Sequence, residues 1–248
     1  MRVLMQSRSN FYTLRGGDTM QLEKTKAELE KIGVEVDISL EYAPDLSKYD
    51  IVHLSNITRV HETYLQMQNA VEQNKPIVLS TIFWPMEEFE QTGQIGIRKI
   101  LNKHLHIDNI ERIKTVARIA KDKSARNIAS KNLISVGYTK MQNYVVEHTD
   151  VFLPNAEEEM RQIETTFHIQ NRDYVVVPNG IDENIAKEKL TSNIPKKFWV
   201  YKDAIICVGR IETRKNQLGL VKALDGSGLK LVLVGAVSGN QISYYKEI

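Results

Sequence analysis

The sequence predicts an α/β protein built around a parallel β-sheet, and two patterns support this prediction. Short apolar runs rich in Val, Ile and Leu alternate with amphipathic stretches of about 10–15 residues. This alternation is typical of parallel strands joined by right-handed helical crossovers. After a polar stretch at 183–203, the same pattern starts again. The sequence therefore predicts an N-terminal domain at 1–182, a linker at 183–203, and the beginning of a second domain at 204–248.

The composition excludes several classes of protein. The chain has 248 residues, of which 42% are hydrophobic and 26% charged, and a net charge of +2. These values are typical of a globular protein and give no reason to expect nucleic acid as a partner. The single cysteine, Cys207, excludes an internal disulfide framework and a Cys-rich zinc site, and no metal site is expected. No apolar run is long enough for a signal peptide or a membrane span, so a cytoplasmic protein is expected.

The N-terminal domain is expected to contain strands and helices in alternation. Apolar runs predict strands at 3–5, 34–38, 51–54, 76–80, 150–154 and 174–177. Helical periodicity predicts helices at 20–32, 60–73, 96–105, 110–126, 133–147 and 156–167. Asn155 is expected to be the N-cap of the last of these helices.

Three segments are expected to face a ligand cleft, because ligands bind beyond the carboxyl ends of parallel strands. These segments are 6–18, 53–56 and 81–88. They supply His53, Asn56 and Trp84 as candidate cleft residues. His53 is compatible with two roles, either a general base or ligand contact, or a strand-end histidine that only satisfies a hydrogen bond within the fold.

The loop before the first helix contains Gly16, Gly17 and Asp18. The double glycine lets the backbone approach a ligand closely, and the positive end of the helix dipole favours an anion there. Asp18 or Thr19 is the expected N-cap. The alternative is an ordinary turn and cap without a ligand.

The region 98–140 contains many more Lys and Arg than Asp and Glu. In the helix expected at 110–126, an apolar stripe of Ile110, Ile113, Val116, Ala117 and Ala120 is surrounded by cations. A basic amphipathic helix of this kind either lies on an anionic membrane surface or forms an ordinary solvated outer face.

The second domain opens with an apolar run at 204–208, followed by Gly209, Arg210 and a polar helix start that includes Lys215. A strand, a glycine turn and a helix N-terminus with two cations form a pocket for an anion, because helix N-termini expose unpaired N–H groups. Arg and Lys favour a phosphate or diphosphate. The alternative is that both cations are solvated residues at a helix start. A strand at 229–234 and the start of a helix at 244–248 follow.

The order of these segments resembles the retaining glycosyltransferases of family four, which have the architecture of two Rossmann-like domains called GT-B. The resemblance extends over essentially the whole chain. The most specific part is the pair VVVPNGID at 175–182 and CVGRIETRKNQLGLVKAL at 207–224. Weaker matches are RGGD at 15–18, DIVHLSN at 50–56, PIVLSTIFWP at 76–85, DVFLPNAEEE at 150–159 and LKLVLVG at 229–235.

This resemblance implies transfer of a sugar from a nucleotide-sugar donor to a glycan or lipid-linked acceptor, with retention, in surface polysaccharide or glycoconjugate biosynthesis. It implies that Gly209, Arg210 and Lys215 bind the donor diphosphate. The loop of Gly16, Gly17 and Asp18 would lie near the phosphates and the acceptor, and the cleft residues His53, Asn56 and Trp84 would lie on the acceptor side. It implies no metal and no cofactor, since the nucleotide sugar is a co-substrate.

The sequence departs from the family pattern in two places. The segment 80–85 lacks the histidine that many members have after the fourth strand, and the family's paired-glutamate motif does not occur before Ile248. We therefore expect a C-terminally truncated chain with little or no turnover, and no catalytic residue is assigned. The alternative function is a non-catalytic Rossmann-like module that binds an acceptor or a partner. A nicotinamide-dependent oxidoreductase is disfavoured because no G-x-G-x-x-G follows the first strand.

Overall fold

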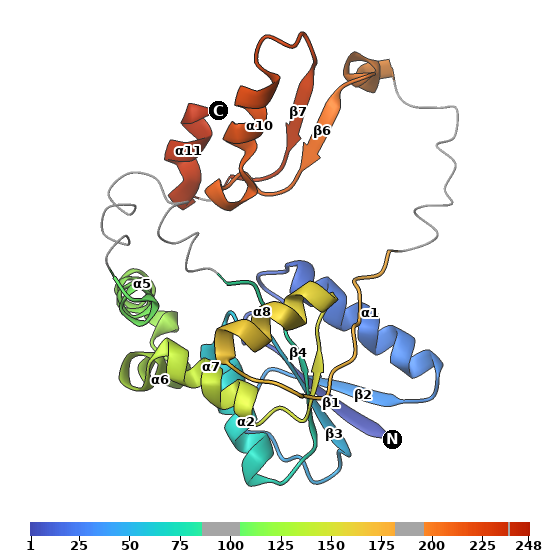
Figure 1. Cartoon of the computed structure of the whole chain (residues 1–248), viewed down its shortest axis with the longest axis vertical. Helices are drawn as coiled ribbons and strands as arrows, with labels where there is room; N and C mark the ends of the chain where they lie inside the picture. The colour runs from blue at the N-terminus through green and yellow to red at the C-terminus, as the bar shows by residue number, and fades with distance from the viewer. Residues whose placement is uncertain (86–104, 182–195, 238) are drawn as a thin grey trace. The chain divides into compact units, whose positions relative to one another are not determined.

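The computed structural model describes residues 1–85, 105–181, 196–237 and 239–248, which belong to two compact units (Figure 1). The N-terminal unit comprises Met1–Pro85 and His106–Asn179, and the C-terminal unit comprises Met86–Leu105 and Gly180–Ile248. The boundary after Asn179 lies close to the expected end of the first domain at 182. The assignment of 86–105 to the C-terminal unit was not expected from the sequence.

The N-terminal unit contains a sheet of five parallel strands in the order β2-β1-β3-β4-β5. The chain runs from β1 to β2 on one side and then crosses β1 to reach β3 on the other. The strands are β1 Arg2–Gln6, β2 Glu35–Ser39, β3 Ile51–Ser55, β4 Ile77–Ser80 and β5 Val151–Leu153. The predicted α/β class with a Rossmann-like parallel sheet is thus confirmed.

Apolar clusters lie on both faces of this sheet, which explains why its strands are nearly continuous apolar runs. Successive side chains of a strand point to opposite faces. In β1, Val3 and Met5 belong to a cluster with Leu22 of α1, whereas Leu4 belongs to the larger cluster. The helices of the unit are α1 Gly17–Lys31, α2 Val60–Glu72, α5 Ile107–Lys121, α6 Ile128–Val136, α7 Tyr138–Glu147 and α8 Glu157–Phe167.

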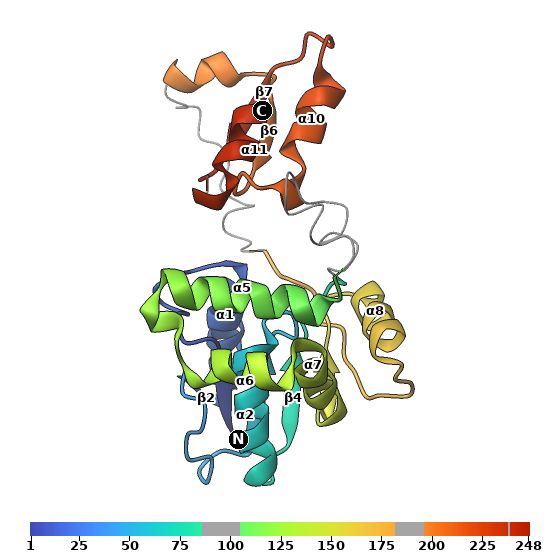
Figure 2. The ribbon, with the colours of Figure 1, turned by 90° about the vertical axis from the view of Figure 1, so that its left-hand side faces the viewer.

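The helices α2, α5, α6 and α7 contact one another and form one layer of the unit (Figure 2). The side chains that they bury include Met67 of α2, Leu133 of α6 and Met141 of α7, all in the larger cluster.

Several expected elements differ from the structure. The single helix expected at 133–147 is wrong, because Gly137 adopts a φ of 99° that ends α6 and begins α7. The helix expected at 110–126 ends at Lys121 and is followed by a short 3-10 helix, Lys123–Ala125. The strand expected at 174–177 is reduced to a bridge between Tyr174 and Phe152. The N-cap of α8 is Ala156 rather than Asn155. The helix expected at 96–105 lies, except for Leu105, outside the described residues.

The described part of the C-terminal unit is a two-stranded parallel sheet with two helices. The strands are β6 Ile205–Val208 and β7 Leu231–Val234, and the helices are α10 Gln217–Leu224 and α11 Ile242–Glu247. Three short 3-10 helices accompany them, Lys196–Tyr201, Thr213–Lys215 and Gly239–Gln241. Most of the linker expected at 183–203 lies outside the described residues. Strand side chains such as Ile206, Val208 and Val234 are exposed.

Candidate functional site

A small pocket lies where the chain leaves β1 and β3. These neighbouring strands border the crevice at which the strand order reverses, and open parallel sheets bind ligands at such a point. The pocket has a volume of about 10 Å³, enough for about one water molecule. Its lining residues come from the loops after both strands and from the first turns of α1 and α2: Ser7, Arg8, Asp18, Ser55, Asn56, Arg59, Glu62 and Thr63.

The buried guanidinium of Arg8 organises the loop between β1 and α1. It donates to both carboxylate oxygens of Asp18, at 2.6 Å from Nε and 3.1 Å from Nη2. It also donates to the backbone and side-chain oxygens of Asn10, to the Leu14 carbonyl at 2.6 Å and to the Thr19 hydroxyl. A planar donor group suits this arrangement, because it can satisfy several acceptors at once. This role of Arg8 was not predicted from the sequence.

The packing of the glycine-rich loop explains why a glycine is needed at one of its positions, Gly16. Gly16, rather than Asp18 or Thr19, is the N-cap of α1, so the expected capping residue is wrong. A β-carbon on Gly16 would lie 2.7 Å from Asp18 Oδ1 and would disturb the pair with Arg8. Nothing lies within 4 Å of a β-carbon placed on Gly17. Gly17 therefore has open space beside it at the first residue of the helix.

The carboxylate of Asp18 is committed to Arg8. Burial alone would raise the pKa of Asp18, but the hydrogen bonds and the charge of Arg8 outweigh this effect and hold the pKa below its usual range. Asp18 is therefore ionised at neutral pH, and its negative charge faces a cation of the same loop. It lines the pocket as half of an ion pair.

Asn56 holds the start of α2. It adopts a left-handed conformation with a φ of 82°, which asparagine tolerates better than most residues. Its Oδ1 accepts a hydrogen bond of 2.7 Å from the backbone N–H of Arg59. The Thr63 hydroxyl donates to the carbonyls of Ser55 and Asn56. The structure thus brings Asn56, one of the expected cleft residues, and Asp18 of the glycine-rich loop to one pocket.

The acidic residue of this helix start, Glu62, is also engaged. It is buried, and its carboxylate accepts from the backbone N–H and the hydroxyl of Ser9, the latter at 2.6 Å. The Tyr42 hydroxyl donates to it at 3.1 Å. Burial and then the nearby charge of Glu62 raise the pKa of Tyr42 to about 12. Tyr42 therefore remains a hydrogen-bond donor at physiological pH.

His53 and Trp84 do not line this pocket. His53 is buried within β3, and its Nε2 lies 2.8 Å from the Ser80 hydroxyl of the adjacent strand. Burial lowers the pKa of His53 to about 4, so its imidazole is neutral at pH 7. This geometry corresponds to the structural role that the sequence allowed. Trp84 is exposed after β4, where Phe83 is buried and donates its backbone N–H to Glu159 at 2.7 Å.

The turn after β6 depends on a close approach between two backbone segments. Gly209 has a φ of 153°, which L side chains rarely adopt, and its N–H donates to the Val234 carbonyl at 2.9 Å. A β-carbon on Gly235 would lie only 1.8 Å from the Gly209 carbonyl oxygen. Arg210 follows with an exposed side chain, 3.8 Å from Glu212. The Gln217 amide donates to the Arg210 carbonyl at 2.9 Å and fixes the turn.

Lys215 lies before the helix rather than within its first turn. It ends the 3-10 helix Thr213–Lys215, and Asn216, with a φ of 52°, separates it from α10. One N–H of the helix start, that of Leu218, donates to the Tyr244 hydroxyl at 2.9 Å. The side chain of Lys215 is exposed and has no polar partner in the described part of the chain. The helix therefore begins at Gln217 and does not include Lys215, which was expected within its start.

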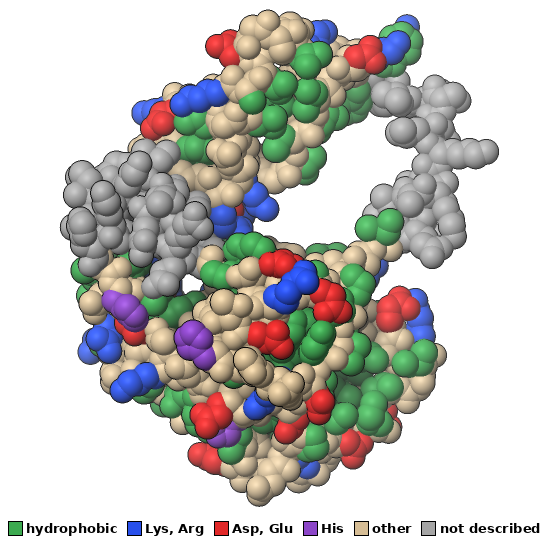
Figure 3. Space-filling view, in the orientation of Figure 1, with side chains coloured by type: hydrophobic (Ala, Val, Ile, Leu, Met, Phe, Trp, Pro, Cys, Tyr) green, Lys and Arg blue, Asp and Glu red, His purple; other side chains and the backbone are tan. Residues whose placement is uncertain are grey.

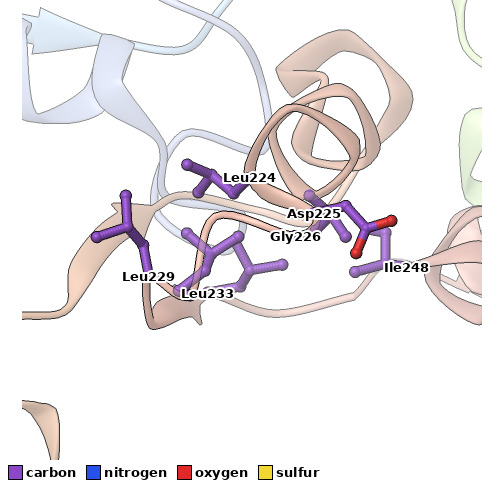
Figure 4. A pocket seen from close by; sticks show the side chains of 9 residues that line it. Leu224, Asp225, Gly226, Leu229, Leu233 and Ile248 are labelled. Carbon is purple, nitrogen blue, oxygen red and sulfur yellow. The ribbon is translucent and has the colours of Figure 1, made fainter.

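The C-terminal unit also has a larger, open hollow of about 480 Å³ (Figure 4). It lies beside the end of α10 and the beginning of β7, away from the carboxyl end of β6. Asp225, Gly226 and Gly228 line it together with six apolar side chains. These are Val221, Leu224, Leu229, Leu231, Leu233 and Ile248. A hollow without converging donors does not suit a phosphate.

No group of His, Cys, Asp and Glu side chains in the described ranges is arranged to hold a metal ion. None of the helices there is both long and apolar enough to cross a bilayer. The chain matches no protein-family model and no curated protein. The motifs and the geometry described above are therefore the basis on which a function is proposed.

Proposed function

We propose that this chain is part of a retaining glycosyltransferase of family four with the GT-B architecture. It would transfer a sugar from a nucleotide-sugar donor to a glycan or lipid-linked acceptor in the synthesis of a surface polysaccharide or glycoconjugate. The N-terminal unit would bind the acceptor and the C-terminal unit the donor. The observation that carries the proposal is the turn at Gly209, which presents Arg210 at the carboxyl end of a parallel strand.

The charges of this turn support a diphosphate ligand. Arg210 is 3.8 Å from Glu212, whereas Arg214 contacts the same carboxylate at 3.0 Å. Glu212 therefore pairs more closely with Arg214 than with Arg210. The positive charges of Arg210 and Lys215 would then be available to an external anion. In a sugar transfer, negative charge builds on the leaving diphosphate, and donors fixed around it lower the barrier. Cations alone can supply this stabilisation, so the proposal needs no metal.

Substitution of Arg210 or Lys215 by alanine is expected to weaken the binding of UDP, GDP or ADP by roughly tenfold each, because each change removes a charge-assisted hydrogen bond. Calorimetric titration of each nucleotide into the 248-residue chain measures this loss. Arg214→Ala is the matched control, since Arg214 pairs with Glu212, and it should bind nearly as the unchanged chain does. Equal affinity in all three variants would contradict the diphosphate assignment.

A non-catalytic binding module is the second candidate function. It is favoured by the Tyr244 hydroxyl, which uses one of the N–H groups at the start of α10 that a phosphate would otherwise accept from. A module of this kind would bind an acceptor through the N-terminal unit and no nucleotide through the C-terminal unit. The nucleotide titration separates the two functions.

We also propose that α5 contacts an anionic membrane surface, which would bring the enzyme to a lipid-linked acceptor. The side chains of Ile113, Val116, Ala117 and Ala120 are exposed on one face of the helix, while Ile110 is buried. Exposed cations accompany this stripe: Arg118, Lys121, Lys123 and Arg126. Figure 3 shows Lys and Arg side chains on the side of the N-terminal unit where α5 and α6 lie. An apolar face with surrounding cations suits anionic lipid.

The double substitution Ile113→Gln and Val116→Gln is expected to reduce binding to anionic vesicles by roughly tenfold or more, because two apolar side chains no longer enter the lipid. Flotation with phosphatidylglycerol vesicles, compared with phosphatidylcholine vesicles, measures the effect. Ile128→Gln is the control, since Ile128 is similarly exposed but lies at the start of α6. If the unchanged chain floats with neither kind of vesicle, the membrane contact is excluded.

A further inference from the structure

Consecutive apolar side chains are exposed in the short 3-10 helix Lys196–Tyr201 of the C-terminal unit. Phe198, Trp199, Val200 and Tyr201 have exposed fractions between 46% and 64%. We refer to residues 196–202 as the aromatic segment. Single exposed apolar residues are normal on a folded chain, whereas a continuous exposed run is typical of a surface that binds something.

The aromatic segment combines these apolar side chains with lysines. A 3-10 helix has three residues per turn, so residues three apart lie on the same side of it. The backbone N–H of Lys202 donates to the Trp199 carbonyl at 3.0 Å, which extends this geometry by one residue beyond the helix. Trp199 therefore lies on the same side as Lys196 and Lys202, while Phe198 lies on the same side as Tyr201.

The positive charge of the aromatic segment is not neutralised by its surroundings. The segment contains three lysines, and the only carboxylate that adjoins it in the sequence is that of Asp203. In the described ranges, no ion pair joins these lysines to a carboxylate. Lys197 Nζ lies 5.0 Å from the centre of the Phe198 ring. A further cation adjoins the segment, since Lys230 Nζ lies 3.5 Å from the Val200 carbonyl oxygen.

The aromatic segment lies away from the turn that is proposed to bind the donor. It precedes β6, whereas Gly209 follows the carboxyl end of the same strand. Figure 1 shows the 3-10 helix, in orange, at the opposite end of β6 from that turn. The strand spans roughly 13 Å at about 3.3 Å per residue. Binding of a diphosphate at Arg210 therefore does not explain the exposed aromatic side chains.

The mixture of aromatic side chains and lysines favours a membrane surface over a protein partner. Lysine is depleted in interfaces between proteins, although Trp, Tyr and Phe are enriched there. Where a bilayer meets water, in contrast, Trp and Tyr lie among the headgroups, and lysines extend their ammonium groups to the polar layer. A cluster of exposed lysines adds attraction to anionic lipid.

We propose that the aromatic segment inserts into the headgroup region of a membrane that contains anionic lipid. The rings of Phe198 and Trp199 lie between the headgroups in this contact, and the lysines of the segment lie beside the lipid phosphates. The contact belongs to the C-terminal unit, so it is separate from the one proposed for α5. It does not depend on the proposed glycosyl transfer.

Trp199 is itself the probe for the first experiment, because the chain has two tryptophans and Trp84→Phe removes the other. Vesicles of phosphatidylglycerol in phosphatidylcholine are added to this variant of the 248-residue chain. The emission of Trp199 should shift to shorter wavelength, and lipids brominated near the glycerol end of their acyl chains should quench it. The same shift is expected when Ile113→Gln and Val116→Gln are added.

The emission of Trp199 also gives the results that would overturn the inference. If the chain floats with the vesicles and the emission of Trp199 stays unchanged, another surface such as α5 makes the contact. If the emission shifts without vesicles as the chain is concentrated, the aromatic segment is a contact between copies of the chain. The nucleotide titration tests the donor site separately from both results.

Substitutions of the apolar side chains measure their share of the binding. Phe198→Ser combined with Trp199→Ser should weaken flotation with the same vesicles by roughly tenfold or more, because two rings no longer enter the lipid. Tyr245→Ser is the matched control, since Tyr245 is an aromatic residue exposed elsewhere in the same unit. Equal flotation of the double variant and this control would contradict the inference.

Substitutions of the lysines test the preference for anionic lipid. Lys196→Gln and Lys197→Gln should each weaken flotation with phosphatidylglycerol vesicles by roughly fivefold and should have little effect with phosphatidylcholine alone. Lys222→Gln is the control, because Lys222 is exposed on α10 of the same unit. If Lys222→Gln weakens flotation as much as the segment variants do, the attraction is a property of the whole unit and the inference fails.

Discussion

Replacing Arg8 with alanine is expected to lower the free energy of unfolding of the N-terminal unit by about 3 to 5 kcal/mol. The substitution removes the hydrogen bonds from the guanidinium to Asn10, Leu14, Asp18 and Thr19, and it leaves the largely buried carboxylate of Asp18 without its cation. An unpaired charge away from water is among the most destabilising changes in a protein. Chemical denaturation, followed by the signals of the N-terminal unit, measures the loss.

The same loop offers a matched control. Arg15 pairs with Glu23 at 2.5 Å, but the side chains are 50% and 32% exposed, so water screens the charge that is left when one partner is removed. Arg15→Ala should therefore cost far less than Arg8→Ala. The double variant Arg8→Ala and Asp18→Ala should recover part of the loss, because no charge is then left alone. Equal losses for Arg8→Ala and Arg15→Ala would show that Arg8 does not organise the loop.

The ion pair also predicts a dependence on pH. The pKa of Asp18 is lower in the folded chain than in the unfolded chain, so its contribution to stability is present above the unfolded pKa of about 3.9. This contribution is lost as the pH falls through the folded pKa. The difference in stability between the unchanged chain and Asp18→Asn should therefore be constant near neutral pH and should shrink below pH of about 4.

The sheet and its order of elements could be predicted from the sequence because they follow from continuous apolar runs. Strands such as β1 and β3 are buried on both faces. Such strands consist of nearly continuous apolar residues, which are easy to recognise in the sequence even over a few positions. The break between α6 and α7 could not be predicted in this way. The helical periodicity runs through Gly137 without interruption, and only the backbone conformation of Gly137 separates the helices.

The candidate site was predicted in part. The rule that ligands bind at the carboxyl ends of parallel strands pointed to the loops that contain Asp18 and Asn56, and the structure places both residues at one small pocket. It did not identify Arg8 or Arg59, because their roles depend on contacts between segments far apart in the chain. Ser9 and Glu62, for example, are 53 positions apart, yet a hydrogen bond joins their side chains beside the pocket.

The positions of Arg8 and Arg59 in the sequence were nevertheless a signal from which their proximity could have been predicted. Arg8 follows β1 and Arg59 follows β3 after a short turn, and both strands are neighbours in the sheet. Arginines placed after two neighbouring parallel strands are expected to approach each other, whatever their partners. What could not be predicted from the sequence is that Arg8 is buried and stabilises the loop, whereas Arg59 is exposed.

Gly235→Ala is expected to have the largest effect in the C-terminal unit, with a loss of about 3 kcal/mol or more. The added β-carbon would lie 1.8 Å from the Gly209 carbonyl oxygen and 3.3 Å from the Arg210 nitrogen. Both neighbours are backbone atoms, so no side chain can rotate away to relieve the clash. The strands would have to separate at this point, and the turn that presents Arg210 would separate with them.

Hydrogen exchange locates this effect. The N–H groups of Gly209 and Ile211 donate to the carbonyls of Val234 and Ala236, at 2.9 and 3.0 Å, so they report on the contact between the two segments. Their exchange should become much faster in Gly235→Ala, while the amides of β1 and β3 should not change. Gly239→Ala is the control, because nothing lies within 4 Å of a β-carbon at that position in the same unit. If Gly235→Ala keeps the slow exchange of Gly209, the close approach of the two backbone segments is not a requirement of the fold. Nucleotide binding through Arg210 should then also survive the substitution.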